Sequence, residues 1–308
     1  MSSRVPEHDT AVDRSIAAAA IPKRYVIVTP VRDEEEHLEN TLQAVIAQVI
    51  RPERWIIVND GSSDSTASIA ERYAHQHHWI TVVHRSDRGA RKNGSGVIEA
   101  FNEGYKQLQG VEWDFIVKLD GDLTFPPDYV QRCLQEFDRD PSLGVGGGAL
   151  YNITESGPQF EPHPWFHVRG ATKIYRKACW EQIGHLWSGT GWDTIDEVKA
   201  NMAHWSTRTF PEIHAFHHRM TGAAEGGWRD NVKNGQGSYI AGYHPLYVLA
   251  RCIRRVRRKP YVVGAVAMLY GFIAARWKQV NRIDDPQVIR FVQAQQLNRL
   301  FGRTTVWK

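Results

Sequence analysis

The chain has 308 residues, of which 42% are hydrophobic, 11% aromatic and 23% charged. These proportions exclude a chain that is disordered throughout, because aromatic residues and nearly balanced charge allow a buried core. The formal net charge of +4 permits an anionic ligand but gives no reason to expect a nucleic-acid partner. Cys133, Cys179 and Cys252 are too far apart for a disulfide framework or a zinc site, which favours a cytoplasmic protein.

Three regions are predicted along the chain. Residues 1–22 form a flexible leader that is polar, then rich in alanine, and lacks the features of a secretory signal. Residues 23–243 form the main domain, in which short apolar strands alternate with helices. Residues 244–308 form a helical region that combines basic and apolar residues.

The alternation in the main domain predicts an α/β fold with a mostly parallel central sheet that helices cover on both faces. Each predicted strand is a short apolar run, and each helix has apolar residues at helical spacing. The predicted strands cover 25–29, 55–58, 80–83 and 115–119, and the predicted helices cover 34–49, 64–75, 94–108 and 129–138.

Polar loops follow three of these strands, at 30–35, 59–64 and 120–122. The carboxyl ends of parallel strands meet at one edge of the sheet, where such folds bind ligands. In the third loop Asp120 and Asp122 flank one glycine, and carboxylates this close repel each other unless a cation neutralises them. Mg²⁺ and Mn²⁺ prefer oxygen ligands and take further ligands from water and substrate phosphates. The sequence therefore favours a metal–diphosphate site over a simple acidic turn.

These motifs resemble those of the family-2 glycosyltransferases, which are nucleotide-sugar enzymes with the GT-A fold. The resemblance rests on Pro30–Glu34, 58–66 and Lys118–Asp122, which recur in the order and spacing typical of that family. It covers roughly residues 24–220. The resemblance implies that residues 23–243 are a catalytic domain.

The resemblance divides this domain into a nucleotide-binding half over about 23–125 and an acceptor half over about 126–243. Asp60 matches the aspartate that hydrogen-bonds the base, usually uracil. Arg32-Asp33 stand where the family usually has Tyr-Asn, so stacking of the base at that position is not implied. The residues assigned to the nucleotide-sugar donor in the first half are Thr29, Pro30, Arg32, Glu34, Asp60, Gly61, Ser62, Asp64, Arg91, Asn102 and Asp120.

The resemblance also implies a divalent metal, Mn²⁺ or Mg²⁺, held by Asp122 with Asp120 nearby. His218 follows a short predicted strand and completes the metal shell in one interpretation; in the other it is a packed or solvated histidine. Arg219 is expected to bind the donor and to neutralise the leaving diphosphate.

An inverting transfer needs one general base that takes the proton of the acceptor hydroxyl near the anomeric carbon. The family supplies this base from a Glu-Asp motif at the start of a helix, and 191–199 fills that place here. One alignment puts Asp193 on the base and Trp192 on the glutamate, whereas another makes Asp196 and Glu197 the acidic pair. One of these acids is expected to cap the helix instead.

The glycine-rich strand at 144–149 has two interpretations. The missing side chains either allow a sugar to approach the backbone closely or relieve crowding inside the sheet.

Residues 245–278 contain a basic amphipathic helix followed by a charge-free segment. Leu246, Leu249 and Ile253 lie on one stripe of the helix, and arginines occupy its other faces. This pattern favours peripheral attachment to the inner face of a membrane. The alternative is a pair of helices packed on the catalytic domain. A membrane-spanning helix is not expected, because the apolar segment 260–275 is too short.

The sequence thus predicts a metal-dependent, inverting glycosyltransferase that moves a sugar from a nucleotide-diphosphate sugar, most simply a UDP-sugar, to a hydroxyl of a glycan or lipid-linked acceptor. Two alternatives are a sugar-1-phosphate nucleotidyltransferase and a membrane-associated subunit that binds nucleotide without catalysis. The first would carry a glycine-rich loop near its N-terminus, and none is present. The second conflicts with the intact set of acidic residues.

Overall fold

The computed structural model describes residues 23–87, 95–189, 191–219, 226–257 and 260–307, so the predicted leader lies outside the described residues. The strands are β1 (Tyr25–Val31), β2 (Arg54–Asn59), β3 (Ile80–His84), β4 (Phe115–Leu119), β5 (Leu123–Thr124), β6 (Leu143–Thr154), β7 (Gly157–Phe160), β8 (Thr172–Arg176) and β9 (Ser206–His217). The helices are α1 (Leu38–Ile46), α2 (Thr66–Gln76), α3 (Ser95–Lys106), α4 (Tyr129–Arg139), α5 (Lys177–Ile183), α6 (Trp192–Met202), α7 (Gly226–Ile240), α8 (Pro245–Arg255), α9 (Tyr261–Trp277) and α10 (Pro286–Leu300).

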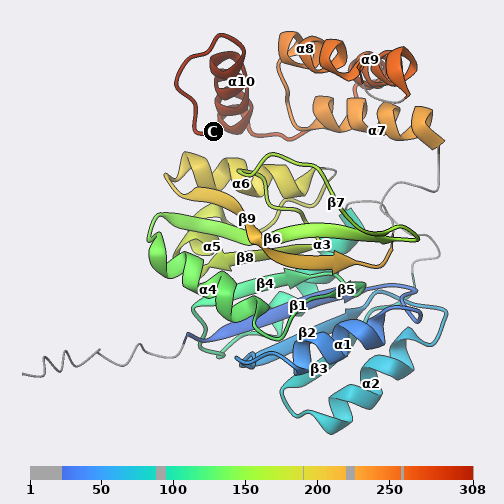
Figure 1. The fold of residues 1–308 in the computed structure, drawn as a ribbon, viewed down its shortest axis with the longest axis vertical. Helices are drawn as coiled ribbons and strands as arrows, with labels where there is room; N and C mark the ends of the chain where they lie inside the picture. Colours follow the sequence, from blue (N-terminus) through green and yellow to red (C-terminus); the bar gives the residue numbers. More distant parts are fainter. Residues whose placement is uncertain (1–22, 88–94, 190, 220–225, 258–259, 308) are drawn as a thin grey trace, which may run out of the picture.

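One sheet runs through the centre of the molecule in the strand order β3-β2-β1-β4-β8-β6-β9-β5, with β7 paired to β6 (Figure 1). Strands β1 to β4 pair in parallel, as the alternation predicts. Strand β8 runs antiparallel between β4 and β6, whereas β6 and β9 pair in parallel. The predicted α/β fold is confirmed, and its parallel pairing is concentrated in the first half of the sheet.

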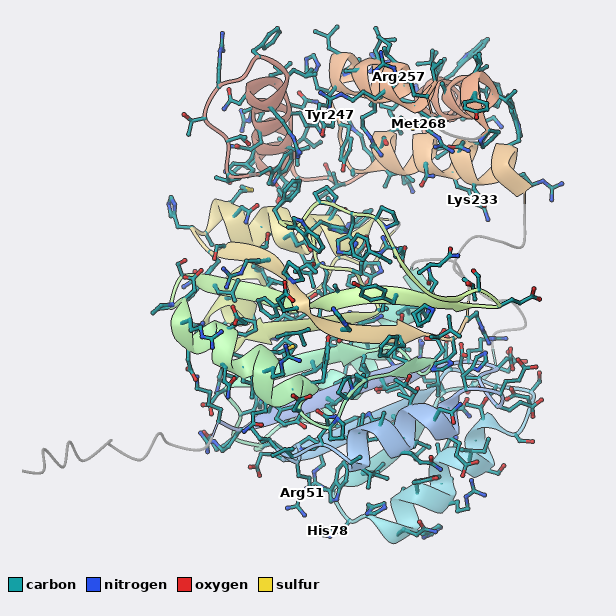
Figure 2. All side chains as sticks on the ribbon, in the orientation of Figure 1. Arg51, His78, Lys233, Tyr247, Arg257 and Met268 are labelled. Atoms are coloured by element: carbon teal, nitrogen blue, oxygen red, sulfur yellow. The ribbon has the colours of Figure 1, made fainter. Side chains whose placement is uncertain are left out.

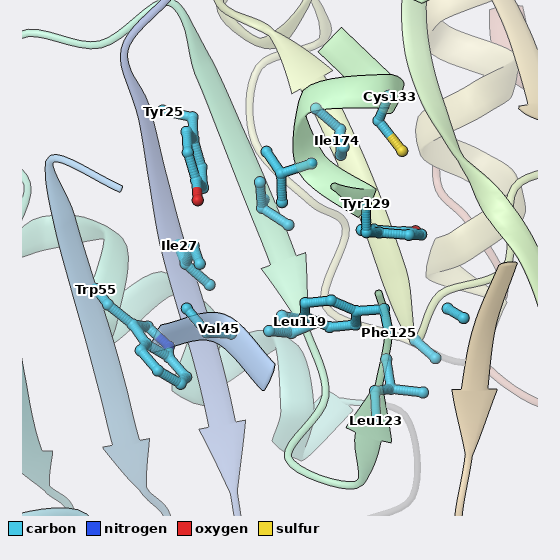
Figure 3. Packing of buried hydrophobic residues seen from close by; sticks show 14 of the residues in the cluster. Tyr25, Ile27, Val45, Trp55, Leu119, Leu123, Phe125, Tyr129, Cys133 and Ile174 are labelled. Carbon is cyan, nitrogen blue, oxygen red and sulfur yellow. The ribbon is translucent and has the colours of Figure 1, made fainter. Parts of the chain in front are cut away.

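Helices α1, α2 and α4 cover one face of the sheet, and α3, α5 and α6 cover the other. Figure 3 shows the first of these layers, where Ile27 and Val45 pack between Tyr25 and Trp55. The hydroxyl of buried Tyr25 donates to the carbonyl of Ile50 at 2.6 Å, which satisfies its only polar group. The central strands are apolar on both faces because both faces are covered.

The glycines of β6 make room for neighbouring backbone. A Cβ atom on Gly148 would lie 2.5 Å from the carbonyl oxygen of Ile213 in β9, and one on Gly147 would lie 2.6 Å from that of Thr172 in β8. Of the two interpretations of 144–149, relief of crowding therefore accounts for these positions.

The C-terminal helices form a second group at one end of the sheet (Figure 1). Helices α7, α8 and α9 share a small apolar cluster that includes Met268, which Figure 2 shows at the contact between α7 and α9. Helix α10 and Trp307 pack on α6 instead. The domain boundary predicted at residue 243 stays a prediction. Because α7 packs chiefly against α9, this packing favours a boundary before α7. No helix in the described ranges has the length and apolar character needed to cross a membrane.

Glycine allows the backbones of α7 and α9 to touch. A Cβ atom on Gly235 would lie 2.0 Å from the carbonyl oxygen of Met268, whereas one on Gly237, two positions along the same helix, would meet nothing within 4 Å. We expect Gly235→Ala to lower the free energy of unfolding by about 1–3 kcal/mol, the usual cost of overpacking. The control Gly237→Ala should be neutral or slightly stabilising, since alanine favours a helix. Urea unfolding followed by circular dichroism measures both, and equal effects would contradict this packing.

Candidate active site

A cavity of about 200 Å³ lies at the carboxyl ends of β1, β2 and β4. The lining residues that the sequence assigned to the donor are Pro30, Arg32, Glu34, Asp60, Asp120 and Arg219. Asp122 also lines the cavity, and so do Gly96, Val97 and Ala100 of α3, which the sequence analysis did not single out. We call this space the donor cavity. The predicted meeting of polar loops at this edge is confirmed for these residues.

Five of the predicted donor residues do not line this cavity. Thr29 is fully buried, and its hydroxyl accepts a hydrogen bond from the indole Nε1 of Trp55 at 2.8 Å. Asn102 lines a separate cavity between α3 and the loop that follows α5. Neither side chain therefore lines the donor cavity, because the face that a residue takes depends on the register of β1 and on the rotation of α3, which the motif alone does not specify.

Gly61, Ser62 and Asp64 instead shape the loop after β2. Gly61 has φ +72° and sits against the backbone of Asp87, a position that an L side chain would strain. The Ser62 hydroxyl accepts from the backbone N–H of Asp33 at 3.1 Å, and Asp64 accepts from that of Glu35 at 3.1 Å. The contacts of Ser62 and Asp64 join the loop after β2 to the loop after β1, so these residues stabilise the loops that form the donor cavity rather than line it. Arg91 lies outside the described residues.

Arginines surround Asp60. Arg85 donates to Asp60 Oδ1 at 2.6 Å, and Arg32 donates to the Asp60 backbone carbonyl at 3.0 Å. The sequence analysis missed Arg85, although its position directly after β3 places it at the same edge of the sheet. Arg219 donates to the Asp33 carbonyl at 2.9 Å and pairs with Glu34 at 3.0 Å. The donor cavity therefore holds guanidinium groups next to the acidic loop.

The histidine whose side chain contacts the acidic loop is His217, whereas His218 reaches it only through its backbone N–H, which donates to the Asp122 carbonyl at 3.0 Å. Nε2 of His217 lies 3.0 Å from Asp122 Oδ2, whereas Nε2 of His218 lies 2.8 Å from the hydroxyl of Thr124. The interpretation of His218 as a metal ligand stays a prediction, and the side chain that contacts Asp122 is that of its neighbour His217. Successive side chains of β9 point to opposite faces, so only one of the two histidines can face Asp122, and the sequence does not fix which.

The contact between His217 and Asp122 changes the pKa of both groups. Burial alone would raise the pKa of Asp122, but the hydrogen bond and the charge of His217 outweigh it and lower that pKa. Burial opposes the charge of His217 as well, yet the same contact with Asp122 raises the pKa of the histidine. Asp122 thus stays ionised next to the cavity.

Asp122 fits a divalent cation. Its Oδ1 atom is buried and has no hydrogen-bond partner among the described residues, so one anionic oxygen is available. No group of three His, Cys, Asp or Glu side chains converges in the part of the chain that the structure describes. A cation that takes one or two protein carboxylates and fills its other positions with water and phosphate oxygens matches this donor set.

Asp120 is held by a buried lysine. Lys118, inside the otherwise apolar strand β4, forms an ion pair with Asp120 and donates to the carbonyl of Gly170 at 2.7 Å. Lys118 itself is almost fully buried, and a lysine inside such a strand is a sequence signal that something must neutralise it. One oxygen of Asp120 is thereby engaged.

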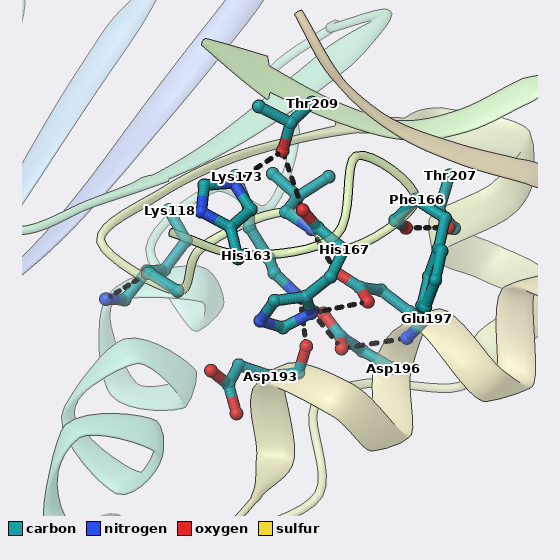
Figure 4. A network of polar contacts seen from close by, with 12 residues as sticks. Lys118, His163, Phe166, His167, Lys173, Asp193, Asp196, Glu197, Thr207 and Thr209 are labelled. Carbon is teal, nitrogen blue, oxygen red and sulfur yellow. Dashed lines mark hydrogen bonds and ion pairs between the residues drawn. The ribbon is translucent and has the colours of Figure 1, made fainter. Parts of the chain in front are cut away.

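Asp196 and Glu197 belong to a buried network in α6 (Figure 4). Lys173, with 0% exposure, lies 2.9 Å from Asp196 Oδ2 and 2.9 Å from Glu197 Oε1. Glu197 also accepts from His167 Nδ1 at 2.9 Å and from the backbone N–H of Val168 at 2.7 Å. Both carboxylates are buried and engaged in ion pairs and hydrogen bonds, so this network has a structural role. The alignment that makes them the catalytic pair stays a prediction.

Asp193 occupies the first turn of α6 and is partly exposed. Its backbone carbonyl accepts from Lys173, and its side chain lines a cavity between α6 and the C-terminal helices. A Cβ atom on Gly170 would lie 3.3 Å from Asp193 Cβ, and the Gly170 carbonyl binds Lys118. Asp193, the partly exposed acid of α6, therefore lies next to Gly170, whose carbonyl binds the same lysine that pairs with Asp120 in the acidic loop.

Trp192 packs against both buried lysines. Lys118 Nζ lies 5.2 Å and Lys173 Nζ 5.6 Å from the centre of its ring. Aromatic rings attract cations in this geometry, most strongly where water is excluded. Trp192 is buried, so its ring lies against both ammonium groups where water is excluded.

A family model described as glycosyl transferase family 2 matches residues 26–191, which is more than half of the chain. The chain belongs to glycosyl transferase family 2. The matched segment contains β1 to β8 and ends just before Asp193. The motif-based resemblance is therefore confirmed at the level of the family.

Two curated relatives illustrate the match. The chain is 32% identical to poly-beta-1,6-N-acetyl-D-glucosamine synthase of Staphylococcus aureus (strain COL) over 116 residues, 38% of this chain and 26% of the relative. It is 24% identical to glycosyltransferase GlyA of Streptococcus pneumoniae serotype 4 over 161 residues, 50% of this chain and 20% of the relative. The chain thus matches about a quarter or less of the length of either relative.

Solved structures share the fold. The mannosyltransferase PcManGT from Pyrobaculum calidifontis, in complex with GDP-Man and Mn²⁺, gives a TM-score of 0.56 at 16% identity, over 93% of this chain and 77% of that chain. Residues 1–349 of S. aureus TarS, in complex with UDP, give 0.52 at 15% identity, over 83% of this chain and 72% of that chain. The GT-A fold that the motifs imply is confirmed.

The buried network predicts how the stability of this family member depends on pH. Burial opposes the charge of His167, but the charge of Glu197 and the hydrogen bond to it raise the pKa of the histidine. A raised folded-state pKa stabilises the fold fully below the unfolded value, about 6.5, and that stabilisation is lost as pH rises through the folded-state pKa. We expect the free energy of unfolding to fall with pH above about 6.5.

Urea unfolding over this pH range measures the effect. His167→Gln should reduce the slope, because this titrating group is gone, and the raised pKa of His217 accounts for a slope that remains. His78→Gln is the control, since His78 is exposed and lies at the end of the molecule far from α6 (Figure 2). An unchanged slope in His167→Gln would contradict the assignment.

Proposed function

We propose that the chain is an inverting glycosyltransferase that moves a sugar from a UDP-sugar to a hydroxyl of a glycan or lipid-linked acceptor and uses a divalent metal. The observation that carries the proposal is the pair of available carboxylates. Asp122 keeps a free oxygen at the donor cavity, and Asp193 keeps its side chain accessible on α6, while the neighbouring acids are engaged.

The donor cavity suits a nucleotide diphosphate. Arg219 and Arg32 line it and provide positive charge for phosphate oxygens. Asp60, in the place of the family's base-binding aspartate, is oriented by Arg85. The complexes of TarS with UDP and with UDP-GlcNAc support a uridine donor, and the complex of the mannosyltransferase with Mn²⁺ supports the metal.

The chemistry follows from these positions. Asp193 takes the proton of the acceptor hydroxyl, whose oxygen forms a bond to the anomeric carbon on the face opposite the diphosphate. The bond between that carbon and the diphosphate oxygen breaks, and the diphosphate leaves with its electron pair. Arg219 supports the charge that develops on it. A dication on Asp122, when bound, supplies further electrostatic stabilisation of the leaving group.

Two substitutions test the separate roles of the acids. Asp193→Asn should lower kcat by about 10²–10⁴-fold, the usual contribution of a general base. It should leave the thermal shift caused by UDP and Mn²⁺ unchanged, because the donor cavity is intact. Asp122→Asn should remove both the transfer activity and the Mn²⁺-dependent part of that shift. Release of UDP from a panel of UDP-sugars and GDP-sugars measures turnover.

Glu181→Gln on α5 is the control, since Glu181 is exposed and lies outside both cavities. Full turnover in Asp193→Asn would refute the role of the base. UDP binding without sugar release from any donor would favour the non-catalytic subunit instead. Full activity in excess EDTA would refute the metal.

We also propose that α8 and α9 attach the protein to the inner face of a membrane. These helices lie on the side of α7 away from the sheet (Figure 1). Part of their apolar surface is exposed rather than packed on other helices: Ile253 is 64%, Val266 51% and Trp277 85% exposed. Arginines flank the stripe on α8, and such a combination of apolar and basic residues suits an anionic bilayer surface.

Flotation with vesicles of phosphatidylglycerol and phosphatidylcholine tests the attachment. The protein should bind, and binding should weaken with added salt. Ile253→Glu and Val266→Glu should each remove most of the bound fraction. Val49→Glu is the matched control, because Val49 is 63% exposed and follows α1, far from these helices. Absence of binding in the unmodified protein, or an equal loss in the control, would contradict the proposal.

A further inference from the structure

The cavity that contains Asp193 differs in character from the donor cavity. It has a volume of about 340 Å³ and lies between α6 and the C-terminal helices α7, α8 and α10. Figure 2 shows Tyr247, one of its lining residues, on the side of α8 that faces α6. We call it the α6 cavity. Since Asp193 lines it, a molecule bound there can present a hydroxyl to the candidate base.

Two buried hydrogen-bond donors in the lining of the α6 cavity have no partner among the described residues. Gln296 is fully buried, and its Oε1 accepts from the backbone N–H of His244 at 2.8 Å, which leaves Nε2 as the unpaired atom. Nε of Arg169 is likewise buried without a partner. Buried donors are rarely left unpaired, and both residues line the α6 cavity, so acceptor oxygens of a bound ligand would give these donors partners.

Two further arginines line the α6 cavity. Arg251 lies 5.5 Å from the ring centre of Tyr243 and donates to the Ser238 hydroxyl at 3.1 Å. Arg299 lies 5.1 Å from the ring centre of Phe166. Neither forms an ion pair with a carboxylate in the described ranges, whereas the aromatic rings hold both guanidinium groups in place.

The carboxylates of the α6 cavity do not cancel this charge. Lys173 and protonated His167 together balance two carboxylates, Glu197 and its neighbour Asp196. Arg169 pairs with Glu161, which leaves Asp193 against Arg251 and Arg299. The cavity therefore combines excess positive charge with unpaired donors.

We propose that the α6 cavity binds a phosphate or diphosphate ester of the acceptor, so that the acceptor of this enzyme is a phosphorylated molecule. This inference rests on the proposed function, because it takes Asp193 as the base. Guanidinium groups bind phosphate oxygens through paired N–H donors, and the Gln296 amide offers one more. Arg251 lies on the helix that carries the exposed apolar stripe, which favours a lipid as the source of the phosphate.

Binding experiments without turnover test the proposal on the full chain. Isothermal titration with farnesyl diphosphate probes a lipid-borne diphosphate, and titration with glycerol 3-phosphate probes a soluble phosphate ester. Both titrations use Asp122→Asn without added metal, so that metal-dependent binding at the donor cavity is removed. We expect Arg299→Gln and Arg251→Gln each to weaken binding of the preferred probe roughly tenfold or more.

Arg290→Gln and Arg282→Gln are the matched controls, because they remove exposed arginines that lie on α10 and in the segment before it, outside the α6 cavity and outside α8. They should bind the probes normally. Arg299 is exposed, so Arg299→Gln is expected to fold, and Arg299→Lys should recover part of the affinity by restoring the charge.

Binding of the lipid probe alone supports a lipid-linked acceptor phosphate, and binding of the soluble probe alone supports a soluble one. Failure of both probes to bind, or equal losses in variants and controls, would overturn the proposal. These outcomes are independent of the turnover of Asp193→Asn, which tests the catalytic proposal separately.

Discussion

Two buried lysines face each other across β4 and β8, and the arrangement of the site depends on them. Lys118 and Lys173 are direct partners in the antiparallel register, and both are almost completely buried. Like charges in such positions destabilise a sheet, and a buried ammonium group is costly unless it is paired. Each lysine is paired with acids from a different segment, Lys118 with the acidic loop and Lys173 with α6. The loop and the helix are thereby fixed to the same point of the sheet.

This charge compensation separates structural acids from acids that are available for chemistry. Asp196 and Glu197 form ion pairs with Lys173 and His167, and one oxygen of Asp120 forms an ion pair with Lys118. Removing Lys173 would leave the buried carboxylate of Asp196 without a cationic partner, which is usually far worse than never having had the pair. The remaining acids, one in the loop and one at the exposed start of α6, are where a metal and a base can act. Proximity in the sequence therefore says little about which acid reacts.

The sequence correctly predicted which polar loops meet at the carboxyl edge of the sheet, because strands and loops are determined by local sequence patterns. Short apolar strands and polar loops require only neighbouring residues, so the positions of Asp60 and Asp120 followed from the order of elements. Thr29 and the choice between His217 and His218 depend on which face a side chain takes, and a shift of one residue reverses that. Arg85 contributes through a contact between loops, which no local pattern encodes.

The acceptor side of the enzyme depends most on long-range packing. The sequence match to the family ends at residue 191, whereas the α6 cavity is closed by helices that come after it. Those helices are held in place by glycines that let α7 and α9 touch and by the apolar contact of α10 with α6. The donor cavity lies at the edge of the sheet that the family model matches. The charge and shape of the α6 cavity are set largely by the C-terminal helices. Helix α6 and the C-terminal helices next to it thus bring together the candidate base, the arginines of the α6 cavity and the exposed apolar surface. This is the arrangement expected if the hydroxyl to be glycosylated arrives attached to an anionic, membrane-bound molecule.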